Sequence, residues 1–137
     1  SSSATVGMVL VLGNSGLLDL KTAICIMLGD NIGTCITAQM ASLTGNLNAR
    51  RTAWAHTLYN VIGVIIALIL LNPFLKAVQL LTLCFNGSDD LALQIANSHT
   101  LFNIFSAVIF LPLHKQYVKF IEAIIDKPLN KSWNNSR

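Results

Sequence analysis

The apolar stretch over residues 52–71 constrains the fold of this chain more than any other feature. Its second half reads VIGVIIALILL and is almost purely aliphatic. A helix rises about 1.5 Å per residue, so about 20 residues cross the hydrocarbon core of a bilayer. Only 11% of the 137 residues are charged and 53% are hydrophobic, whereas soluble domains carry about 25% charged residues. We therefore expect an all-α membrane protein.

The second half of the chain predicts further helices. Residues 91–113 form a second predicted span, and the Asn-Pro pair at 72–73 ends or kinks the first one. Residues 74–85 predict an apolar helix at the membrane interface. Apolar and charged side chains fall on opposite faces over residues 114–125. Residues 114–137 are therefore predicted to be an amphipathic helix and a polar cytoplasmic tail.

The first 43 residues predict interrupted helices instead of a full span. Residues 4–12 and 17–28 are each too short to cross a bilayer, and the sequence Gly-Asn-Ser-Gly at 13–16 signals a turn. This pattern predicts a re-entrant helical hairpin over residues 1–28, which enters and leaves on one side. The polar segment 29–34 then predicts a broken transmembrane element over residues 17–43. Non-helical backbone at this depth must be buried in protein or line a cavity.

Charge predicts how the chain is oriented in a membrane. Basic residues precede one span and follow the other, whereas Asp89 and Asp90 lie between the spans. Basic flanks are cytoplasmic by the positive-inside rule, which places residues 86–90 outside. We expect a multi-pass protein of the plasma (inner) membrane. A net charge of +3 is too small and scattered to indicate a nucleic-acid partner.

The opening serines are candidate ligands for an anion. Ser1, Ser2 and Ser3 precede an apolar helix, where hydroxyls, free backbone amides and the helix dipole favour a negative charge. Residues 31–34 open a second half-helix with the same polarity. Such discontinuous helices bind substrates in secondary transporters. Simple capping of a helix is the alternative.

Asp30 is a separate candidate, because a carboxylate at membrane depth is costly and usually functional. It would bind sodium, since hard cations prefer oxygen ligands, or it would lie solvated at the membrane edge. Thr5 is a further candidate for sodium binding or for fixing the helix register. Sodium is the only metal that we expect, and no other cofactor.

A short motif occurs in both predicted spans. His56-Thr-Leu-Tyr-Asn60 recurs as His99-Thr-Leu-Phe-Asn103. Positions i and i+4 share a helix face, and polar groups in membrane helices usually face the bundle interior. We expect these four His and Asn side chains to hold helices in register, with ion binding as the alternative. Neither His has a Cys or carboxylate at transition-metal ligand spacing.

Four motifs in this order, SSSAT, GDNIGT, ARRTAWAHTLYN and IANSHTLFN, resemble the sodium/phosphate cotransporter family, specifically its bacterial members. The resemblance extends to about residue 113. It implies two inverted repeats, each with a Gln-Ser-Ser-Ser hairpin and a Gly-Ala-Asn-Ile-Gly-Thr break, and ion and phosphate sites where the repeats meet. Residues 1–113 would be the second repeat, half of an inverted-repeat transporter. Ser1 to Ser3 match the hairpin motif, Asn31, Gly33 and Thr34 match the break, and Asp30 replaces the usual Ala.

The resemblance implies sodium-coupled symport of inorganic phosphate across the plasma membrane by alternating access. The implied partners are phosphate, sodium, the lipid bilayer, the missing first repeat and a cytoplasmic regulatory domain. Two alternatives stay open: a sodium-coupled transporter of another small anion, and a non-transporting membrane anchor or phosphate sensor of the same fold. We do not expect an enzyme, because no G-x-S-x-G, H-E-x-x-H or P-loop pattern occurs.

Overall fold

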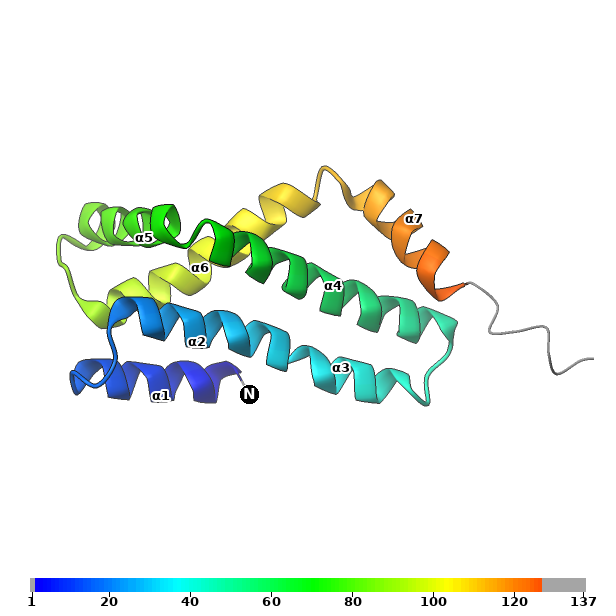
Figure 1. Cartoon of the computed structure of the whole chain (residues 1–137), viewed down its shortest axis with the longest axis horizontal. Helices are drawn as coiled ribbons and strands as arrows, with labels where there is room; N and C mark the ends of the chain where they lie inside the picture. The colour runs from blue at the N-terminus through cyan, green and yellow to red at the C-terminus, as the bar shows by residue number, and fades with distance from the viewer. Residues whose placement is uncertain (1, 127–137) are drawn as a thin grey trace, which may run out of the picture.

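The computed structural model describes residues 2–126, and these contain helices without any strand. The predicted all-helical fold is therefore confirmed. The polar tail and Ser1 lie outside the described residues. The helices are α1 (Ser2–Asn14), α2 (Leu20–Gly33), α3 (Cys35–Ser42), α4 (Leu47–Ile69), α5 (Leu71–Asn86), α6 (Leu91–Phe110) and α7 (His114–Ile125) (Figure 1).

Helix α4 contains the predicted span and is the clearest membrane-crossing element. It has 23 residues, and among the described residues it alone has the length and apolar composition to cross a membrane as a single straight helix. Helices α6 and α7 meet the same test together but are bent by 83°. The structure thus gives one clear span and a bent pair, a weaker membrane signal than the sequence suggests.

The break after α4 confirms the effect expected of the Asn-Pro pair. Helix α4 ends at Ile69, and α5 begins two residues later. Pro73 lies in the first turn of α5, where its missing N–H needs no acceptor. The helix predicted over residues 114–125 is confirmed with the same bounds as α7.

The first two helices form an antiparallel pair, but the predicted turn at residues 13–16 is displaced. Helix α1 continues through Asn14, and Gly13 is buried against α6. A Cβ at Gly13 would lie 3.0 Å from Cδ2 of Leu91. The chain reverses after α1, where Gly16 has a left-handed φ of 73°. Asp19 then caps α2 by accepting a hydrogen bond of 2.8 Å from the backbone N–H of Thr22.

The predicted break over residues 29–34 is much smaller than expected, and no unwound segment exists there. Helix α2 continues to Gly33, and only Thr34 separates it from α3. Thr34 itself keeps helical angles, with φ −66° and ψ −18°, and its N–H donates to the Asp30 carbonyl at 2.9 Å. From Leu20 to Ser42 this element measures about 34 Å along its axis. We call it the α2–α3 element.

The helices enclose a small core and leave much apolar surface uncovered. One cluster joins α2, α4, α5 and α6 around Ile24, Leu28 and Phe102. A second joins α1, α2 and α6 around Val9 and Ile95. Among residues 2–126, 24 large apolar side chains are exposed, whereas 13 apolar residues of any size are buried. Such a surface is typical of a chain that is covered by lipid or by further protein.

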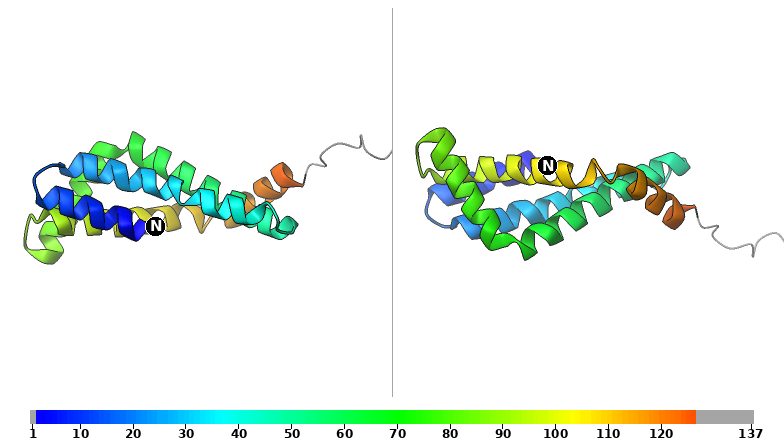
Figure 2. Two further views of the ribbon diagram at one scale, coloured as in Figure 1. Left: turned by 90° about the horizontal axis from the view of Figure 1, so that it is seen from below. Right: turned by 90° about the horizontal axis from the view of Figure 1, so that it is seen from above.

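The long axis of the molecule follows the α2–α3 element and α4, which run antiparallel (Figure 1). Helix α1 covers only part of the α2–α3 element, and its first residues lie beside the middle of that element (Figure 2). Helix α7 folds back onto the beginning of α4.

Candidate functional site

In the described part of the chain, Asp30 is the one charged residue that lies neither on α7 or the first turns of α4 nor at the opposite end of the molecule. Six charged residues lie on α7, at its C-cap or in the first turns of α4, namely Arg50, Arg51, Lys115, Lys119, Glu122 and Asp126. Five lie at the opposite end, namely Asp19, Lys21, Lys76, Asp89 and Asp90. Asp30 follows Asp19 by about 16 Å of helix, which places it near the middle of the α2–α3 element.

The side chain of Asp30 is held by a hydroxyl and by no counter-ion among the described residues. Thr5 Oγ1 donates to Asp30 Oδ1 at 2.8 Å, and this bond joins α1 to α2. Both residues are half-buried. The ion pairs of the described residues all involve Arg51, at the end of the molecule. A carboxylate at mid-depth without a countercharge is costly, and binding a cation would lower that cost.

The predicted serine site lies at the first turn of α1. The helix begins at Ser2, so Ser2 and Ser3 lie within it instead of preceding it. Ser3 is exposed. The first four N–H groups of any helix lack acceptors within the helix, and those of α1 lie one turn from Thr5. Ser1 lies outside the described residues.

The side chains of Asn31 and Thr34 are turned toward their own helix. Asn31 Nδ2 donates to the Met27 carbonyl at 3.2 Å, and Thr34 Oγ1 donates to the Asn31 carbonyl at 3.1 Å. The backbone stays helical here, so residues 31–34 present no unwound carbonyls to a cation. Within the described residues, oxygen ligands for a cation would come from side chains such as Asp30.

Two glycines of α2 close to Asp30 touch no other helix of the described chain. A Cβ at Gly29 or Gly33 would meet nothing within 4 Å, and the same holds at Gly7 of α1. Two residues advance a helix by about 200°, so Gly7 lies on the side of α1 that faces away from Thr5 and Asp30. Gly29 and Gly33 therefore leave room for a ligand or another helix beside the carboxylate.

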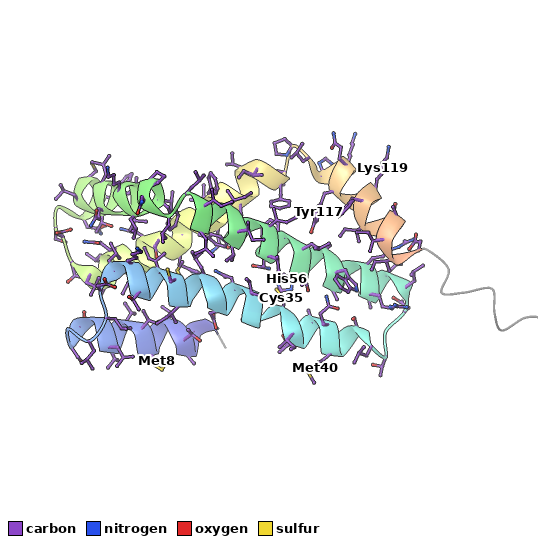
Figure 3. All side chains as sticks on the ribbon, in the orientation of Figure 1. Met8, Cys35, Met40, His56, Tyr117 and Lys119 are labelled. Atoms are coloured by element: carbon purple, nitrogen blue, oxygen red, sulfur yellow. The ribbon has the colours of Figure 1, made fainter. Side chains whose placement is uncertain are left out.

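In both His and Asn pairs, the Asn side chain donates to a carbonyl of its own helix. Asn60 Nδ2 donates to the His56 carbonyl at 2.9 Å, and Asn103 Nδ2 donates to the His99 carbonyl at 2.8 Å. Asn60 is buried, whereas Asn103 is exposed. Figure 3 shows His56 close to Cys35, whose thiol lies 3.9 Å from the His56 carbonyl. Ion binding by these residues stays a prediction.

Other polar side chains make the hydrogen bonds between helices. Gln39 Nε2 of α3 donates to Thr57 Oγ1 at 2.7 Å and to the Ala53 carbonyl of α4 at 3.1 Å. In α6, Asn97 Nδ2 donates to Thr82 Oγ1 of α5 at 3.0 Å. Sequence reasoning missed these residues because they form no repeated motif. Their place on otherwise apolar helices was the available signal.

Gly63 and Ser106, which lie seven residues after the His of each repeated motif, meet across the bundle. A Cβ at Gly63 of α4 would lie 3.1 Å from Ser106 Oγ and 3.3 Å from Phe102 Cζ of α6. Ser106 is buried, and its hydroxyl has no hydrogen-bond partner among the described residues. Gly63 therefore allows the close approach of α4 and α6.

The end of the molecule where α4 begins is fixed by paired charges. Arg51 forms a two-pronged ion pair with Asp126 and also contacts Glu122, with Nη1 and Oε1 3.7 Å apart. The hydrogen bonds from Arg51 hold the pKa of Asp126 below its ordinary value. In α7, Tyr117 donates to the Ala55 carbonyl and packs edge-on against Phe110. Within residues 2–126, no three His, Cys, Asp or Glu side chains converge on a metal site.

Comparisons with known proteins place this chain in a family. The Na+/Pi-cotransporter family matches residues 1–89. The protein named "Uncharacterized protein YqeW" from Bacillus subtilis (strain 168) is 46% identical over 77 residues, which are 56% of this chain and 24% of that protein. No solved structure matches.

A second relative carries a name that mentions phosphate. "Putative inorganic phosphate export protein YjbB" from Salmonella typhimurium (strain LT2) is 29% identical over 83 residues, which are 61% of this chain and 15% of that protein. The chain thus spans less than a quarter of the length of these two relatives. Since the family match covers 89 of its 137 residues, the chain belongs to the Na+/Pi-cotransporter family, which is a family of membrane transporters and not of enzymes.

Proposed function

We propose that this chain is the second repeat of a sodium-coupled phosphate transporter, which moves both ions across the plasma membrane by alternating access. The observation that carries the proposal is the hydrogen bond between Thr5 and Asp30, because it joins a lone mid-depth carboxylate to the helix that begins with the serines. The family match and the phosphate named for one relative support this substrate.

In this proposal, phosphate is bound at the first turn of α1. The backbone amides of that turn and the hydroxyls of Ser1, Ser2 and Ser3 donate hydrogen bonds to phosphate oxygens. Asn31, Gly33 and Thr34 complete the site from α2 after a change of rotamer, since Asn31 and Thr34 now bond to their own helix. A first repeat supplies the other half of the site beside Gly29 and Gly33.

Sodium is bound by Asp30, with Thr5 as a second oxygen ligand. Without sodium, the Asp30 carboxylate repels an anion at the nearby serines. Sodium removes this repulsion, so sodium and phosphate raise each other's affinity by the same factor. The charge of Asp30 therefore couples the two ions, and no covalent step is needed.

The proposal is tested by phosphate uptake into vesicles that contain the full-length protein. We expect an inward sodium gradient to drive uptake, and Ser2→Ala to lower it. Ser15→Ala is the matched control, because Ser15 is an exposed serine beyond the opposite end of α1, bonded to its own Val11 carbonyl. Uptake that ignores sodium, or that survives Ser2→Ala unchanged, contradicts the proposal.

The direction of flux is a separate question, which the name of the Salmonella relative raises. The same vesicles answer it when they are preloaded with phosphate under an outward sodium gradient. Efflux driven by that gradient is the result expected of a reversible coupled transporter. Efflux that needs no sodium favours export without coupling. Sulfate in place of phosphate tests the alternative anion.

A further inference from the structure

Helix α7 has a basic outer face because its two acidic residues are both engaged by α4. Arg51 of α4 pairs with Glu122 and Asp126 and neutralises them, although both side chains stay partly exposed. Lys115 and Lys119 are one helical turn apart and exposed, and neither forms an ion pair within the described residues. Figure 3 shows Lys119 on the outer side of α7, away from the bundle.

Apolar side chains are exposed on the same helix. Ile121 is buried against α4, whereas Phe120 is 53% exposed and Ile124 is 44% exposed. On a helical projection, Phe120 and Ile124 lie on the edge of the apolar face that α4 does not cover. A helix with exposed apolar residues beside a basic stripe fits the boundary between headgroups and acyl chains.

The charges at the two ends of the molecule differ in sign. At the α7 end, that is on α7, at its C-cap and in the first turns of α4, four described basic residues and two acidic ones (4 − 2) give a net charge of +2. At the opposite end, Lys21 and Lys76 with three aspartates (2 − 3) give −1. An anionic surface therefore complements only the α7 end, and it is the side that the positive-inside rule makes cytoplasmic.

We propose that α7 is a binding site for anionic phospholipid headgroups, which Lys115 and Lys119 contact while Phe120 and Ile124 enter the acyl region. The proposal rests on the membrane location in the proposed function. The ion pairs of Arg51 serve it indirectly, because they hold α7 on α4 and neutralise its acidic side chains.

The test uses the full-length protein in membranes of mixed phosphatidylglycerol and phosphatidylcholine. Spin-labelled forms of the two lipids report the preference for the anionic lipid at the protein surface. We expect the wild type to prefer phosphatidylglycerol, and K115Q/K119Q to lose at least fivefold of that preference at the α7 site, since each lysine near an anionic surface contributes about a fivefold effect. Added salt should reduce the wild-type preference by screening.

The matched control is K21Q/K76Q, which removes two lysines from the opposite end and should keep the preference. K115R/K119R should also keep it, because the charge remains. Equal preference in the wild type and K115Q/K119Q, as expected if a protein domain covers α7, overturns the proposal. Sodium-driven uptake of phosphate is measured in parallel. A wild type that takes up phosphate normally but shows no lipid preference contradicts the α7 site alone. A wild type without sodium-driven uptake contradicts the proposed transport function instead.

Discussion

Carboxylates and glycines lie in opposite surroundings in two regions of the molecule. One region is the face of α1 and α2 around Asp30, and the other is where α4 meets α6 and α7. Around Asp30, the carboxylate has only a hydroxyl partner and the neighbouring glycines face open space. At α4, the carboxylates of Glu122 and Asp126 are paired with Arg51. Gly63 packs closely against Phe102 and Ser106 of α6. The difference teaches that these charges and this glycine of α4 find their partners within the described chain, whereas the carboxylate and glycines around Asp30 leave room for a partner from outside it.

The largest effect is expected from Asp30→Asn. If Asp30 couples sodium to phosphate, its loss should lower sodium-driven uptake by about 100-fold, near the upper end of coupling energies of about 1–3 kcal/mol. Asp89→Asn, at the end of the molecule, should leave uptake near the wild-type rate. Uptake in full-length protein vesicles measures both. Equal uptake by the two variants would show that the carboxylate of Asp30 is no more important for transport than one at the end of the molecule.

Gly63→Ala tests the filled region. The new Cβ would lie 3.1 Å from Ser106 Oγ and 3.3 Å from Phe102 Cζ, so overpacking should lower the free energy of unfolding by about 1–3 kcal/mol. Gly7→Ala is the control, because its Cβ meets nothing within 4 Å in this chain. We expect Gly7→Ala to be stable or to gain up to about 1 kcal/mol. Thermal unfolding in detergent compares the two, and equal losses would contradict the contrast.

Thr5 of α1 tests the same site from the helix that faces Asp30. Thr5→Ala removes the hydroxyl that bonds Asp30, and hydrogen bonds to charged groups contribute about 1.5–3 kcal/mol. The sodium concentration for half-maximal uptake should rise about tenfold. Thr5→Ser keeps the hydroxyl and should stay near the wild-type value. A Thr5→Ser variant as impaired as Thr5→Ala would indicate a packing role instead.

The smallest effect concerns the ion pair at the end of α7. Arg51 lowers the pKa of Asp126 below its usual 3.8, so the contact stabilises α7 docking above that pH and is lost as the pH falls through the lowered pKa. Asp126 is exposed and Arg51 only half-buried, so solvent screens the pair and the effect should be small. Hydrogen exchange of the α7 amides at neutral and acidic pH measures it. Asp126→Asn should remove this pH dependence, and a dependence that persists would assign it to another group.

Sequence patterns predicted the helices well and the site less well. The long aliphatic run predicted α4, and the apolar residues spaced three or four apart predicted α7, because this spacing places them on one face of a helix. Gly29 to Thr34 predicted a break that is nearly absent, since tertiary packing of α2 overrides the weak preferences of Gly and Asn. The bond between Thr5 and Asp30 joins residues 25 positions apart, so no local pattern could reveal it.

The equilibrium binding of radiolabelled phosphate to the full-length protein, titrated with sodium, tests the central claim most directly. We predict that sodium tightens phosphate binding by the wild type, and that Asp30→Asn binds phosphate equally well with and without sodium, because its side chain no longer repels the anion. Phosphate affinity that still rises with sodium in Asp30→Asn would contradict the account.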